Sequence, residues 1–461
     1  MPQFAPADLA RWSGGAWRCA PTAPLTGASI NTRTLAVGEV FFALPGVRAD
    51  GHEFVMDAFA RGAAGAVVRA EFAAAHPQLP LLAVADPAVA LRDIAAGYRA
   101  TLPATFVAIT GSVGKTTVKE MTADLLATVG ATARTQGNFN NDLGLPLSLL
   151  AVEPDAKFGV FELGMNHPGE LAPLCKLLRP SISIVTMVGP VHFEFFDSVQ
   201  AIAEEKAAVL RCLPKDGLAI LDADGDWFEL LHAAAPCRLV TTALMAAADY
   251  VARVDAAVPD AFVVNERATG EQAVLQNSLP GAHNVRNALL AVAVARAQSA
   301  TWEDMRRALA AFQPVGLRWQ RSEWRGAAII NDAYNASPPS MAAALKTFAE
   351  TPVAGQRWLV LGGMRELGTA AEDLHNALGH AAAELPGVRL ITVGELGAWI
   401  AAGAFEAGMG AEKIVICDHC DAAAAVLREQ LSAGDAVLLK ASRSEKLERV
   451  LQDLKAALPV V

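Results

Sequence analysis

Short apolar runs alternate with alanine-rich stretches along most of this 461-residue chain, and this alternation constrains the fold more than any other feature of the sequence. Apolar runs that are each followed by a helix-forming stretch are typical of βαβ units, which build parallel sheets. Two groups of such runs predict the strands of a central sheet and of a second sheet nearer the C-terminus. The central group comprises 105–109, 158–161, 182–188 and 218–221, and the second comprises 358–361, 388–393, 414–416 and 436–439. The expected fold class is therefore α/β.

Two prolines mark the expected limits of the domains, because proline interrupts the local pattern on either side of the central group. They are Pro103 and Pro314. We therefore predict an N-terminal domain over 1–100, a central domain over 101–313 and a C-terminal domain over 314–461. The first of these has weaker periodicity and more turn residues, and we interpret it as a separate α/β domain.

The composition excludes several classes of protein. Apolar residues make up 53% of the chain and charged residues 19%, which excludes disorder of the whole chain. No uncharged stretch reaches the roughly 18 residues that a membrane span needs, and residues 1–12 lack the pattern of a signal peptide. The net charge of −10 argues against a nucleic-acid binder, and six irregularly spaced cysteines fit a reducing compartment. We expect a cytoplasmic protein without a membrane span or a nucleic-acid partner.

A glycine-containing segment stands between the first central strand and the helical stretch that follows it. Glycines allow a tight turn whose N–H groups point at phosphate oxygens, and the start of a helix adds a favourable field. Lys115 can then reach the β- and γ-phosphates of a nucleotide, and the Thr116 hydroxyl can bind Mg²⁺. The strict phosphate-loop pattern has glycine where this chain has Ile109. The alternative is a glycine-rich turn with a surface lysine, but the strand–loop–helix context favours phosphate binding. The residues expected to contact the nucleotide here are Gly111, Ser112, Val113, Gly114, Lys115, Thr116 and Thr117.

Three residues further along the chain are candidate partners of a bound Mg·ATP. Glu162 ends a predicted strand and can supply a carboxylate ligand; the alternative is a solvated acid at a strand end. His192 follows another predicted strand and can supply a neutral imidazole, although a lone histidine is more often structural. Lys206 opens a helical stretch that starts at Glu204. Taken alone, Lys206 is predicted to be a solvated lysine.

Together these residues resemble the Mur ligases, ATP-dependent enzymes that form the amide bonds of the peptidoglycan stem peptide. Segment 110–117 (TGSVGKTT) is similar to the phosphate loop of that family, which also lacks the first glycine. Segment 191–198 (VHFEFFDS) is similar to its histidine segment, and 281–288 (GAHNVRNA) matches its adenine-side motif. Lys206 stands where these enzymes carry a lysine that is carbamylated by CO₂. The similar motifs extend over nearly the whole chain.

Within the family, three further segments resemble the branch that adds D-alanyl-D-alanine. They are 136–146 (QGNFNNDLGLP), 162–170 (ELGMNHPGE) and 334–341 (YNASPPSM). The D-N-P-[RK] motif that is usual in the ligase of the preceding step is absent from the sequence. Departures from the family pattern occur at Asn31, Asn331, Ala333, Gly363 and Ala441.

The resemblance implies a three-domain α/β architecture with a central P-loop-type parallel sheet and a Rossmann-like C-terminal domain. It implies an ATP-dependent ligase that adds D-Ala-D-Ala to UDP-MurNAc-tripeptide through an acyl phosphate. Such a ligase acts in peptidoglycan synthesis, and thereby in cell-wall biogenesis, cell shape, cell division and the cell cycle. The alternatives among enzymes are the tripeptide-forming Mur ligase and a protein like folylpolyglutamate synthase. The alternative outside the ligases is a P-loop NTPase that switches a protein partner.

The resemblance also implies roles for particular residues. Lys115, Glu162, His192 and Lys206 would be catalytic. Two Mg²⁺ ions would be held by Thr116, Glu162, His192 and a carbamylated Lys206. Beyond the phosphate loop, ATP would contact His283, Asn284, Arg318 and Asp332. The substrates UDP-MurNAc-tripeptide and D-Ala-D-Ala would contact Thr32, Arg33, Gly46, Asp50, Gly51, His52, Asn138, Asn140, Asn141, Tyr334 and Asn335. The enzyme is expected to be a monomer.

Overall fold

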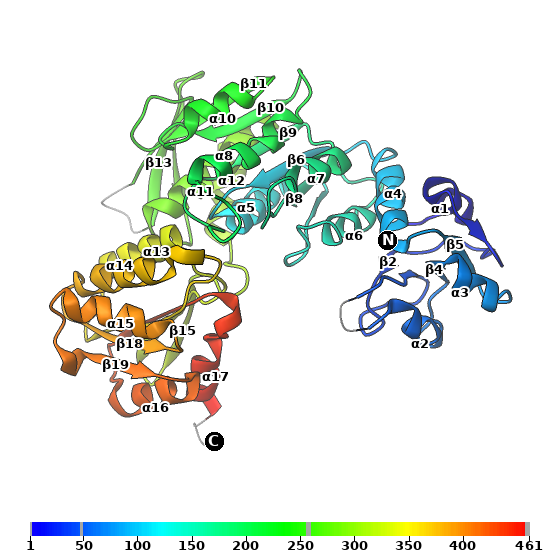
Figure 1. Ribbon diagram of the computed structural model, residues 1–461. Coiled ribbons are helices and arrows are strands. Elements are labelled where there is room, and N and C mark those ends of the chain that lie inside the picture. The colour runs from blue at the N-terminus through cyan, green and yellow to red at the C-terminus, as the bar shows by residue number, and fades with distance from the viewer. Residues whose placement is uncertain (1, 47–48, 255–259, 457–461) are drawn as a thin grey trace.

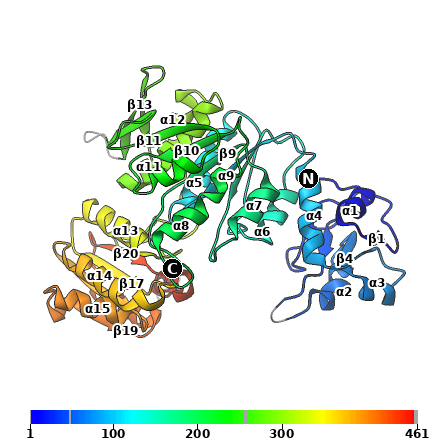
Figure 2. The same cartoon turned by 45° about the horizontal axis from the view of Figure 1, so that its top comes forward.

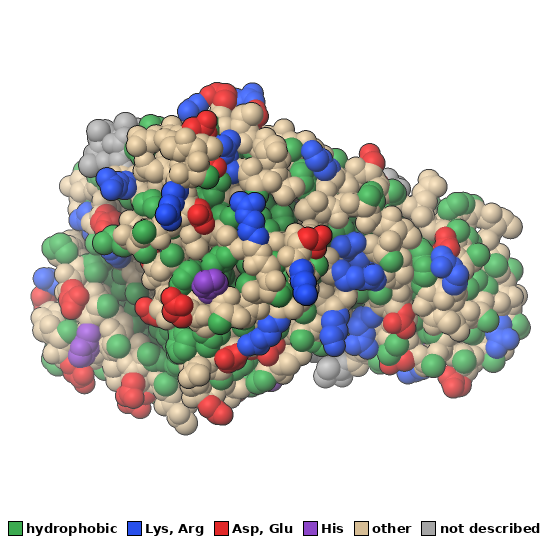
Figure 3. All heavy atoms as spheres, turned by 90° about the horizontal axis from the view of Figure 1, so that it is seen from above, with side chains coloured by type: hydrophobic (Ala, Val, Ile, Leu, Met, Phe, Trp, Pro, Cys, Tyr) green, Lys and Arg blue, Asp and Glu red, His purple; other side chains and the backbone are tan. Residues whose placement is uncertain are grey.

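Three sheets organise the part of the chain that the computed structural model describes, which is residues 2–46, 49–254 and 260–456. Figures 1 and 2 place the N-terminal sheet and the C-terminal sheet on different sides of the central one. Among the described residues, no helix combines the length and the apolar character that crossing a membrane requires. On the face seen in Figure 3, acidic and basic side chains are interspersed.

The N-terminal sheet has the strand order β1-β5-β4-β3-β2, and its strands are parallel except that β1 pairs antiparallel with β5. Its strands are β1 (Ala16–Trp17), β2 (Ala28–Ser29), β3 (Val40–Phe42), β4 (Gly65–Arg69) and β5 (Leu81–Val84). Its helices are α1 (Pro6–Ser13), η1 (Gly51–Phe54), α2 (Val55–Ala60), α3 (Ala70–Ala75) and α4 (Pro87–Arg99). The helix α4 begins at Pro87 because the Asp86 side chain caps it, accepting hydrogen bonds from the backbone N–H groups of Ala88 and Val89.

The central sheet has the strand order β14-β13-β12-β11-β10-β9-β6-β8-β7. Its strands are β6 (Thr105–Thr110), β7 (Thr132–Arg134), β8 (Phe158–Glu162), β9 (Ile182–Val185), β10 (Leu218–Asp222), β11 (Arg238–Ala243), β12 (Tyr250–Val254), β13 (Ala261–Glu266) and β14 (Gln272–Gln276). The four strands predicted for this sheet are confirmed, although β9 ends before the predicted limit at 188. The sheet is parallel from β7 to β12, as expected. Five further strands of this sheet were not predicted: the parallel strands β7, β11 and β12, and the strands β13 and β14, which pair antiparallel.

Helices cover both faces of the central sheet (Figure 1). They are α5 (Lys115–Ala127), α6 (Gly144–Leu150), α7 (Leu171–Leu178), α8 (Val199–Lys206), α9 (Ala208–Arg211), α10 (Phe228–Ala234), α11 (Ala282–Ala297) and α12 (Trp302–Ala311). The alanine-rich helix α11 is buried on every side from Ala288 to Ala295, which is the pattern of a core helix. It packs against α5, the helix that follows the phosphate loop.

The C-terminal sheet has the strand order β15-β16-β20-β17-β18-β19, with β15 antiparallel to β16 and the other pairs parallel. Its strands are β15 (Gln320–Trp324), β16 (Ala327–Asn331), β17 (Arg357–Gly362), β18 (Val388–Val393), β19 (Ile414–Cys417) and β20 (Ala436–Lys440). Its helices are α13 (Pro338–Glu350), η2 (Gly368–Ala370), α14 (Ala371–Ala383), α15 (Gly397–Glu406), η3 (Ala411–Lys413), α16 (Cys420–Gln430), η4 (Arg443–Glu445) and α17 (Glu448–Ala456). The four strands predicted for this sheet are confirmed.

Apolar contacts continue across both junctions between the sheets. One buried cluster joins residues of the central sheet, such as Ile109, to residues of the C-terminal sheet, such as Leu359. A second cluster joins Phe42 of the N-terminal sheet to Phe161 of the central sheet. Burial of apolar surface therefore stabilises the relative placement of the three sheets as well as each sheet alone.

Candidate active site

A cavity of about 1410 Å³ opens between the central sheet and the C-terminal sheet, and most of the predicted site residues line it. Those in its wall are Ser112, Val113, Gly114, Lys115, Thr116, Thr117, Asn138, Asn140, Asn141, Glu162, His192, His283, Asn284, Arg318, Asp332, Tyr334 and Asn335. The predicted residues outside this wall are Gly111, Lys206, Thr32, Arg33, Gly46, Asp50, Gly51 and His52.

The phosphate loop joins the end of β6 to the start of α5 and presents its backbone to this cavity. Gly114 precedes the helix with φ of 90° and contributes no side-chain cap, so the first N–H groups of α5 lack a partner within the helix. At Gly111, φ is 151°, and an added Cβ would lie 1.9 Å from the Thr186 hydroxyl oxygen. That hydroxyl in turn donates a 2.5 Å hydrogen bond to the Val113 carbonyl. The loop is therefore fixed in a shape that only glycine allows and that suits an anion.

The Lys115 side chain folds back over its own loop. Its Nζ donates hydrogen bonds to the carbonyl oxygens of Gly111 at 2.8 Å and of Ser112 at 3.4 Å. Burial lowers the pKa of Lys115, with Glu162 opposing and Arg318 adding to that effect. The alternative of a solvated surface lysine on a glycine-rich turn does not fit a partly buried side chain in this position.

Glu162 is buried at the end of β8, with 4% of its surface exposed, which is inconsistent with a solvated strand-end acid. Its Oε2 accepts a 2.7 Å hydrogen bond from the Thr116 hydroxyl, and its Oε1 accepts a 2.9 Å hydrogen bond from Nδ2 of Asn140. The Glu162 N–H donates to the hydroxyl of Thr135 at 3.2 Å. Asn140, which the resemblance assigns to substrate, thus directs its amide at this carboxylate.

Carboxylate and hydroxyl oxygens are ligands that Mg²⁺ accepts, so Thr116 and Glu162 fit a hard cation. Over the described residues, no group of three or more His, Cys, Asp or Glu side chains could by itself enclose a metal. This donor set is the kind used for Mg²⁺, which usually binds through one or two protein oxygens together with substrate phosphates and water.

His192 lies in the loop after β9 and contacts the C-terminal domain. Its Nδ1 is hydrogen-bonded to Oε2 of Glu366, and the N–H of Glu194 donates to the Glu366 carbonyl at 3.2 Å. The hydrogen bond from His192 lowers the pKa of Glu366. Sequence reasoning missed Glu366, since no spacing rule connects it with a histidine 174 residues away.

Lys206 is neither solvated nor at the start of a helix, so both of these predictions are wrong. It is the last residue of α8 and is 1% exposed. No other described residue forms a hydrogen bond or ion pair with its ammonium group. Burial, together with the charge of Lys115, lowers its pKa well below the ordinary value, although Glu205 opposes this shift. Burial therefore shifts Lys206 toward the neutral amine, which is the form that reacts with CO₂.

Arg318 brings the C-terminal domain into contact with the phosphate loop. One guanidinium nitrogen of Arg318 donates a 2.9 Å hydrogen bond to the Thr116 hydroxyl oxygen. The guanidinium carbon lies 3.6 Å from the centre of the Tyr334 ring, which is a close cation–π contact. Arg318 and Tyr334 therefore act as one unit on the loop side of the cavity.

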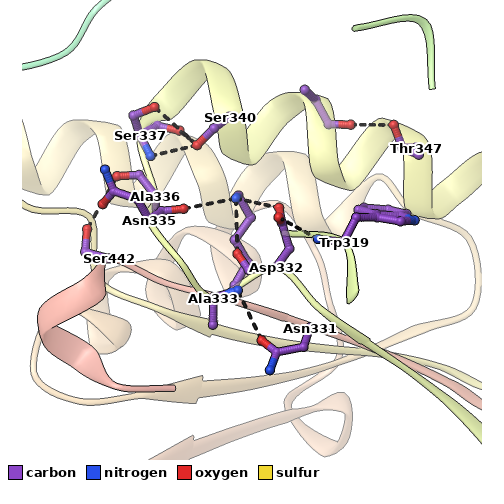
Figure 4. A network of polar contacts seen from close by, with 12 residues as sticks. Trp319, Asn331, Asp332, Ala333, Asn335, Ala336, Ser337, Ser340, Thr347 and Ser442 are labelled. Carbon is purple, nitrogen blue, oxygen red and sulfur yellow. Dashed lines mark hydrogen bonds and ion pairs between the residues drawn. The ribbon is translucent and has the colours of Figure 1, made fainter. Parts of the chain in front are cut away.

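Asp332 is held by a polar network at the end of β16 (Figure 4). Its Oδ1 accepts a 3.1 Å hydrogen bond from the Trp319 N–H, and its Oδ2 accepts a 2.6 Å hydrogen bond from Nζ of Lys440. Lys440 also donates to the Asn335 carbonyl at 3.1 Å. Asn331 and Ala333 are two of the departures from the family pattern, and Asn331 accepts a 3.2 Å hydrogen bond from the N–H of Ala333. Sequence reasoning missed Lys440 as an ion-pair partner of Asp332.

His283 and Asn284 lie in the first turn of α11. Burial lowers the pKa of His283 to about 4, so its imidazole is neutral at ordinary pH. Asn284 is buried, and its Nδ2 donates to the carbonyl of Pro280 at 2.8 Å. Its Oδ1 accepts a 3.2 Å hydrogen bond from Asn287. Asn284 is therefore already engaged within the protein, whereas the His283 ring is free to face a ligand.

Among the predicted residues of the N-terminal domain, Asp50, Gly51 and His52 are neighbours in the chain and form what we call the Asp50 group. The Asp50 carboxylate accepts hydrogen bonds from the His52 N–H and contacts the imidazole of His52 and the guanidinium of Arg69. Hydrogen bonds from His52, with a further contribution from Arg69, lower the pKa of Asp50 to about 2. The N–H of Gly51 donates to Leu44 at 2.8 Å. The other predicted residues have different partners: Thr32 forms a side-chain hydrogen bond with Asp57, the Arg33 N–H donates to Oδ1 of Asn31 at 3.0 Å, and the Gly46 N–H donates to the Ala49 carbonyl at 3.1 Å.

Comparison with known proteins identifies the family. The model of the Mur ligase family catalytic domain matches residues 24–99, that of the Mur ligase middle domain matches 109–295, and that of the Mur ligase glutamate ligase domain matches 317–443. The UDP-N-acetylmuramoyl-tripeptide–D-alanyl-D-alanine ligase of Escherichia coli (strain K12) is 35% identical over 442 residues, 94% of each chain. The protein of that name from Bacillus subtilis (strain 168) is 34% identical over 433 residues, 93% of each chain.

Solved structures agree with these matches. A crystal structure of MurF from Acinetobacter baumannii superposes with a TM-score of 0.87 and 28% identity over 99% of each chain. The MurF ligase from Thermotoga maritima in complex with ADP gives a TM-score of 0.79 and 26% identity, covering 93% of this chain and 97% of that one. The same three-domain α/β architecture is present here. The matches extend over all three domains, and this chain therefore belongs to the Mur ligase family.

Proposed function

We propose that this protein adds D-alanyl-D-alanine to UDP-N-acetylmuramoyl-tripeptide in peptidoglycan synthesis, at the expense of ATP, which becomes ADP and phosphate. Relatives of that name match 94% of the chain, and the tripeptide-forming and folate alternatives are not favoured. The observation that carries the proposal is the hydrogen bond from Arg318 to Thr116. This hydrogen bond joins the phosphate loop to a second domain. A ligase requires such a contact between domains, whereas a simple nucleotide switch does not.

The chemistry begins with a carboxylate, which is anionic and a poor electrophile. Attack of this carboxylate on the γ-phosphorus of ATP gives an acyl phosphate and ADP. The amine of D-Ala-D-Ala then attacks the acyl carbon, and phosphate leaves. Positioning and charge neutralisation provide most of the catalysis in such transfers. Lys115 is the cation that offsets charge on the transferred phosphoryl group.

Mg²⁺ is the metal we propose for this site, held by the oxygens of Thr116 and Glu162. A second Mg²⁺ would be held by His192 and by Lys206 in its carbamylated form. When bound, these ions offset negative charge on phosphate and carboxylate oxygens. Carbamylation suits the environment of Lys206, because its amine is buried and finds no hydrogen-bond or ion-pair partner among the described residues. Burial favours the uncharged amine, whose reaction with CO₂ would give it an anionic oxygen.

The other predicted residues surround this centre. His283 and Asn284 would hold the adenine, and Arg318 and Asp332 would complete the ATP site from the C-terminal domain. Closure of the two domains excludes water that would hydrolyse the acyl phosphate. The UDP end of the substrate would lie against the Asp50 group of the N-terminal domain, outside the main cavity. Tyr334 and Asn335, with Asn138 and Asn141, would face the peptide and amine.

We propose that the domains of this protein span 1–100, 101–313 and 314–461, and that it works as a monomer in the cytoplasm. Its product is a precursor of the cell wall, so loss of the activity would disturb cell shape and cell division.

A phosphate-release assay tests the function. The protein is incubated with ATP, Mg²⁺ and UDP-MurNAc-tripeptide, with and without D-Ala-D-Ala. We expect sustained phosphate release only when both substrates are present, together with a product that is heavier by the dipeptide. Free diaminopimelate, L-lysine and glutamate should be poor amines. Efficient use of diaminopimelate or lysine would assign the protein to the preceding step, and efficient use of glutamate would assign it to the folate branch.

A further inference from the structure

Two loops from different domains meet beside the cavity, and each contributes one residue in the left-handed region of backbone space. His192, from the central domain, has φ of 56°, and Glu366, from the C-terminal domain, has φ of 61°. Such values are uncommon for residues other than glycine and are retained where surrounding contacts enforce them. The Glu194 N–H donates to the Glu366 carbonyl at 3.2 Å, and Gly368 lies against the backbone of Phe193 and Glu194.

The side chains in this contact are hydrogen-bonded as well as the backbones. Nδ1 of His192 is bonded to Oε2 of Glu366. Since a carboxylate can only accept, the proton of a neutral imidazole must be on Nδ1. The Nε2 lone pair of His192 is then available to a ligand in the cavity, whose wall includes both residues. A carboxylate behind a metal-binding histidine fixes the ring orientation and raises the basicity of the ring.

We propose that Glu366 is a positioning residue that orients His192 for the cation and does so from the opposite domain. The C-terminal domain thereby acts on the central metal site through one side chain, in addition to its direct contacts with ATP. The His192 ring is held in its orientation only when the two domains meet, so the geometry of this ligand is coupled to domain closure. This inference rests on the proposed function, because it assumes that His192 binds the metal.

Substitutions at this contact can separate the role of the Glu366 side chain from that of its backbone. Glu366→Ala removes the carboxylate but leaves the backbone carbonyl that Glu194 bonds. Glu366→Gln keeps an oxygen that can accept from Nδ1. Glu194→Ala is the matched control, because it removes an exposed carboxylate from the same loop contact without touching His192. His192→Ala removes the group through which Glu366 is proposed to act.

The first readout is binding of Mn²⁺ to the protein with a non-hydrolysable ATP analogue, measured by electron paramagnetic resonance. We expect Glu366→Ala to weaken Mn²⁺ binding about 10- to 100-fold, as loss of such outer partners does, and Glu194→Ala to leave it unchanged. Glu366→Gln should restore much of the affinity. In the His192→Ala background, Glu366→Ala should cause little further loss, because the two residues act as one unit.

The second readout is the kinetic constants of the amide-forming reaction. Glu366→Ala should lower kcat and raise the Mg²⁺ concentration needed for half-maximal rate, with a smaller effect on the KM of D-Ala-D-Ala. Equal losses from Glu366→Ala in the presence and absence of His192 would overturn the inference, as would unchanged Mn²⁺ binding. A wild-type protein that forms no amide contradicts the proposed function instead, and the Mn²⁺ measurement still tests Glu366 because it needs no acceptor substrate.

Discussion

The hydroxyl of Thr116 and the carboxylate of Glu162 are joined by a 2.7 Å hydrogen bond, although 46 residues separate them in the chain. The hydroxyl oxygen of Thr116 also accepts a 2.9 Å hydrogen bond from Arg318. One side chain therefore connects the helix after the phosphate loop, the end of the neighbouring strand and the C-terminal domain. We therefore expect a change at any of the three to affect the other two, so that the nucleotide site and the domain junction respond together.

Replacement of Lys115 by alanine should lower kcat at least about a hundredfold, or about 2.7 kcal/mol of transition-state free energy. The reason is that no other described lysine donates into this loop, so the phosphoryl group would lose the positive charge that Lys115 supplies. Lys215→Ala is the control, because Lys215 is an exposed lysine away from the loop. Steady-state phosphate release measures kcat, and circular dichroism checks folding. Near-normal turnover by a folded Lys115→Ala protein would show that the phosphate site is assigned wrongly.

Substitution of Gly111 by alanine should abolish nucleotide binding while the rest of the fold persists. The new Cβ would lie 1.9 Å from the Thr186 hydroxyl oxygen, so the loop or the Thr186 side chain that braces it must shift. Gly408→Ala is the matched control, since Gly408 has φ of 90° but open space around its Cβ position. The control should lose about 1–2 kcal/mol of stability through backbone strain and bind nucleotide normally. Calorimetric titration with ADP distinguishes the two variants, and equal affinities would contradict the prediction.

The innermost strands of the parallel sheets could be predicted from sequence because their apolar runs are buried on both faces, whereas the partly buried parallel strands β7, β11 and β12 could not. β6, β8 and β10 all follow that rule, and their limits differ from the predicted ones by no more than one residue. β13 and β14 could not be predicted in this way. In β14 the exposed and buried residues alternate, as in a hairpin with one solvated face, and a search for continuous apolar runs overlooks that pattern.

The site was predictable where function is encoded in a local motif, as in the phosphate loop. It was not predictable where the fold brings distant residues together: Lys440 and Asp332 are 108 residues apart in the chain. The burial of Lys206 was also hidden, since it follows Glu204 and Glu205 in an apparently solvated run. Which face of a helix is buried depends on its neighbours, and two adjacent carboxylates give no indication of it.

Replacement of Asp50 by asparagine should destabilise the N-terminal domain in a pH-dependent way. The pKa of Asp50 in the folded protein is about 2, below the value of about 3.9 expected in the unfolded chain. The unfolded state therefore binds more protons between these values, and the stabilisation by the Asp50 carboxylate is lost as pH falls through this window. Urea unfolding of wild type and Asp50→Asn should differ most above about pH 5 and converge toward pH 2. Asp216→Asn, at an exposed position, should show no such convergence, and a pH-independent difference for Asp50→Asn would contradict the prediction.

Substitution of Lys206 is the strongest test of the metal site, because the buried amine of this residue has no partner among the described residues. If this lysine is only structural, Lys206→Met should retain activity, because methionine fills a similar volume without the amine. If it is carbamylated, both Lys206→Met and Lys206→Ala should lose activity while ADP still binds through the phosphate loop. The gap in Lys206→Ala could admit acetate, which would partly replace the missing anion, whereas Lys206→Met has no room for it. Phosphate release is therefore measured for both variants with and without short-chain carboxylates. Rescue of Lys206→Ala alone would support the carbamate, and a fully active Lys206→Met would exclude it.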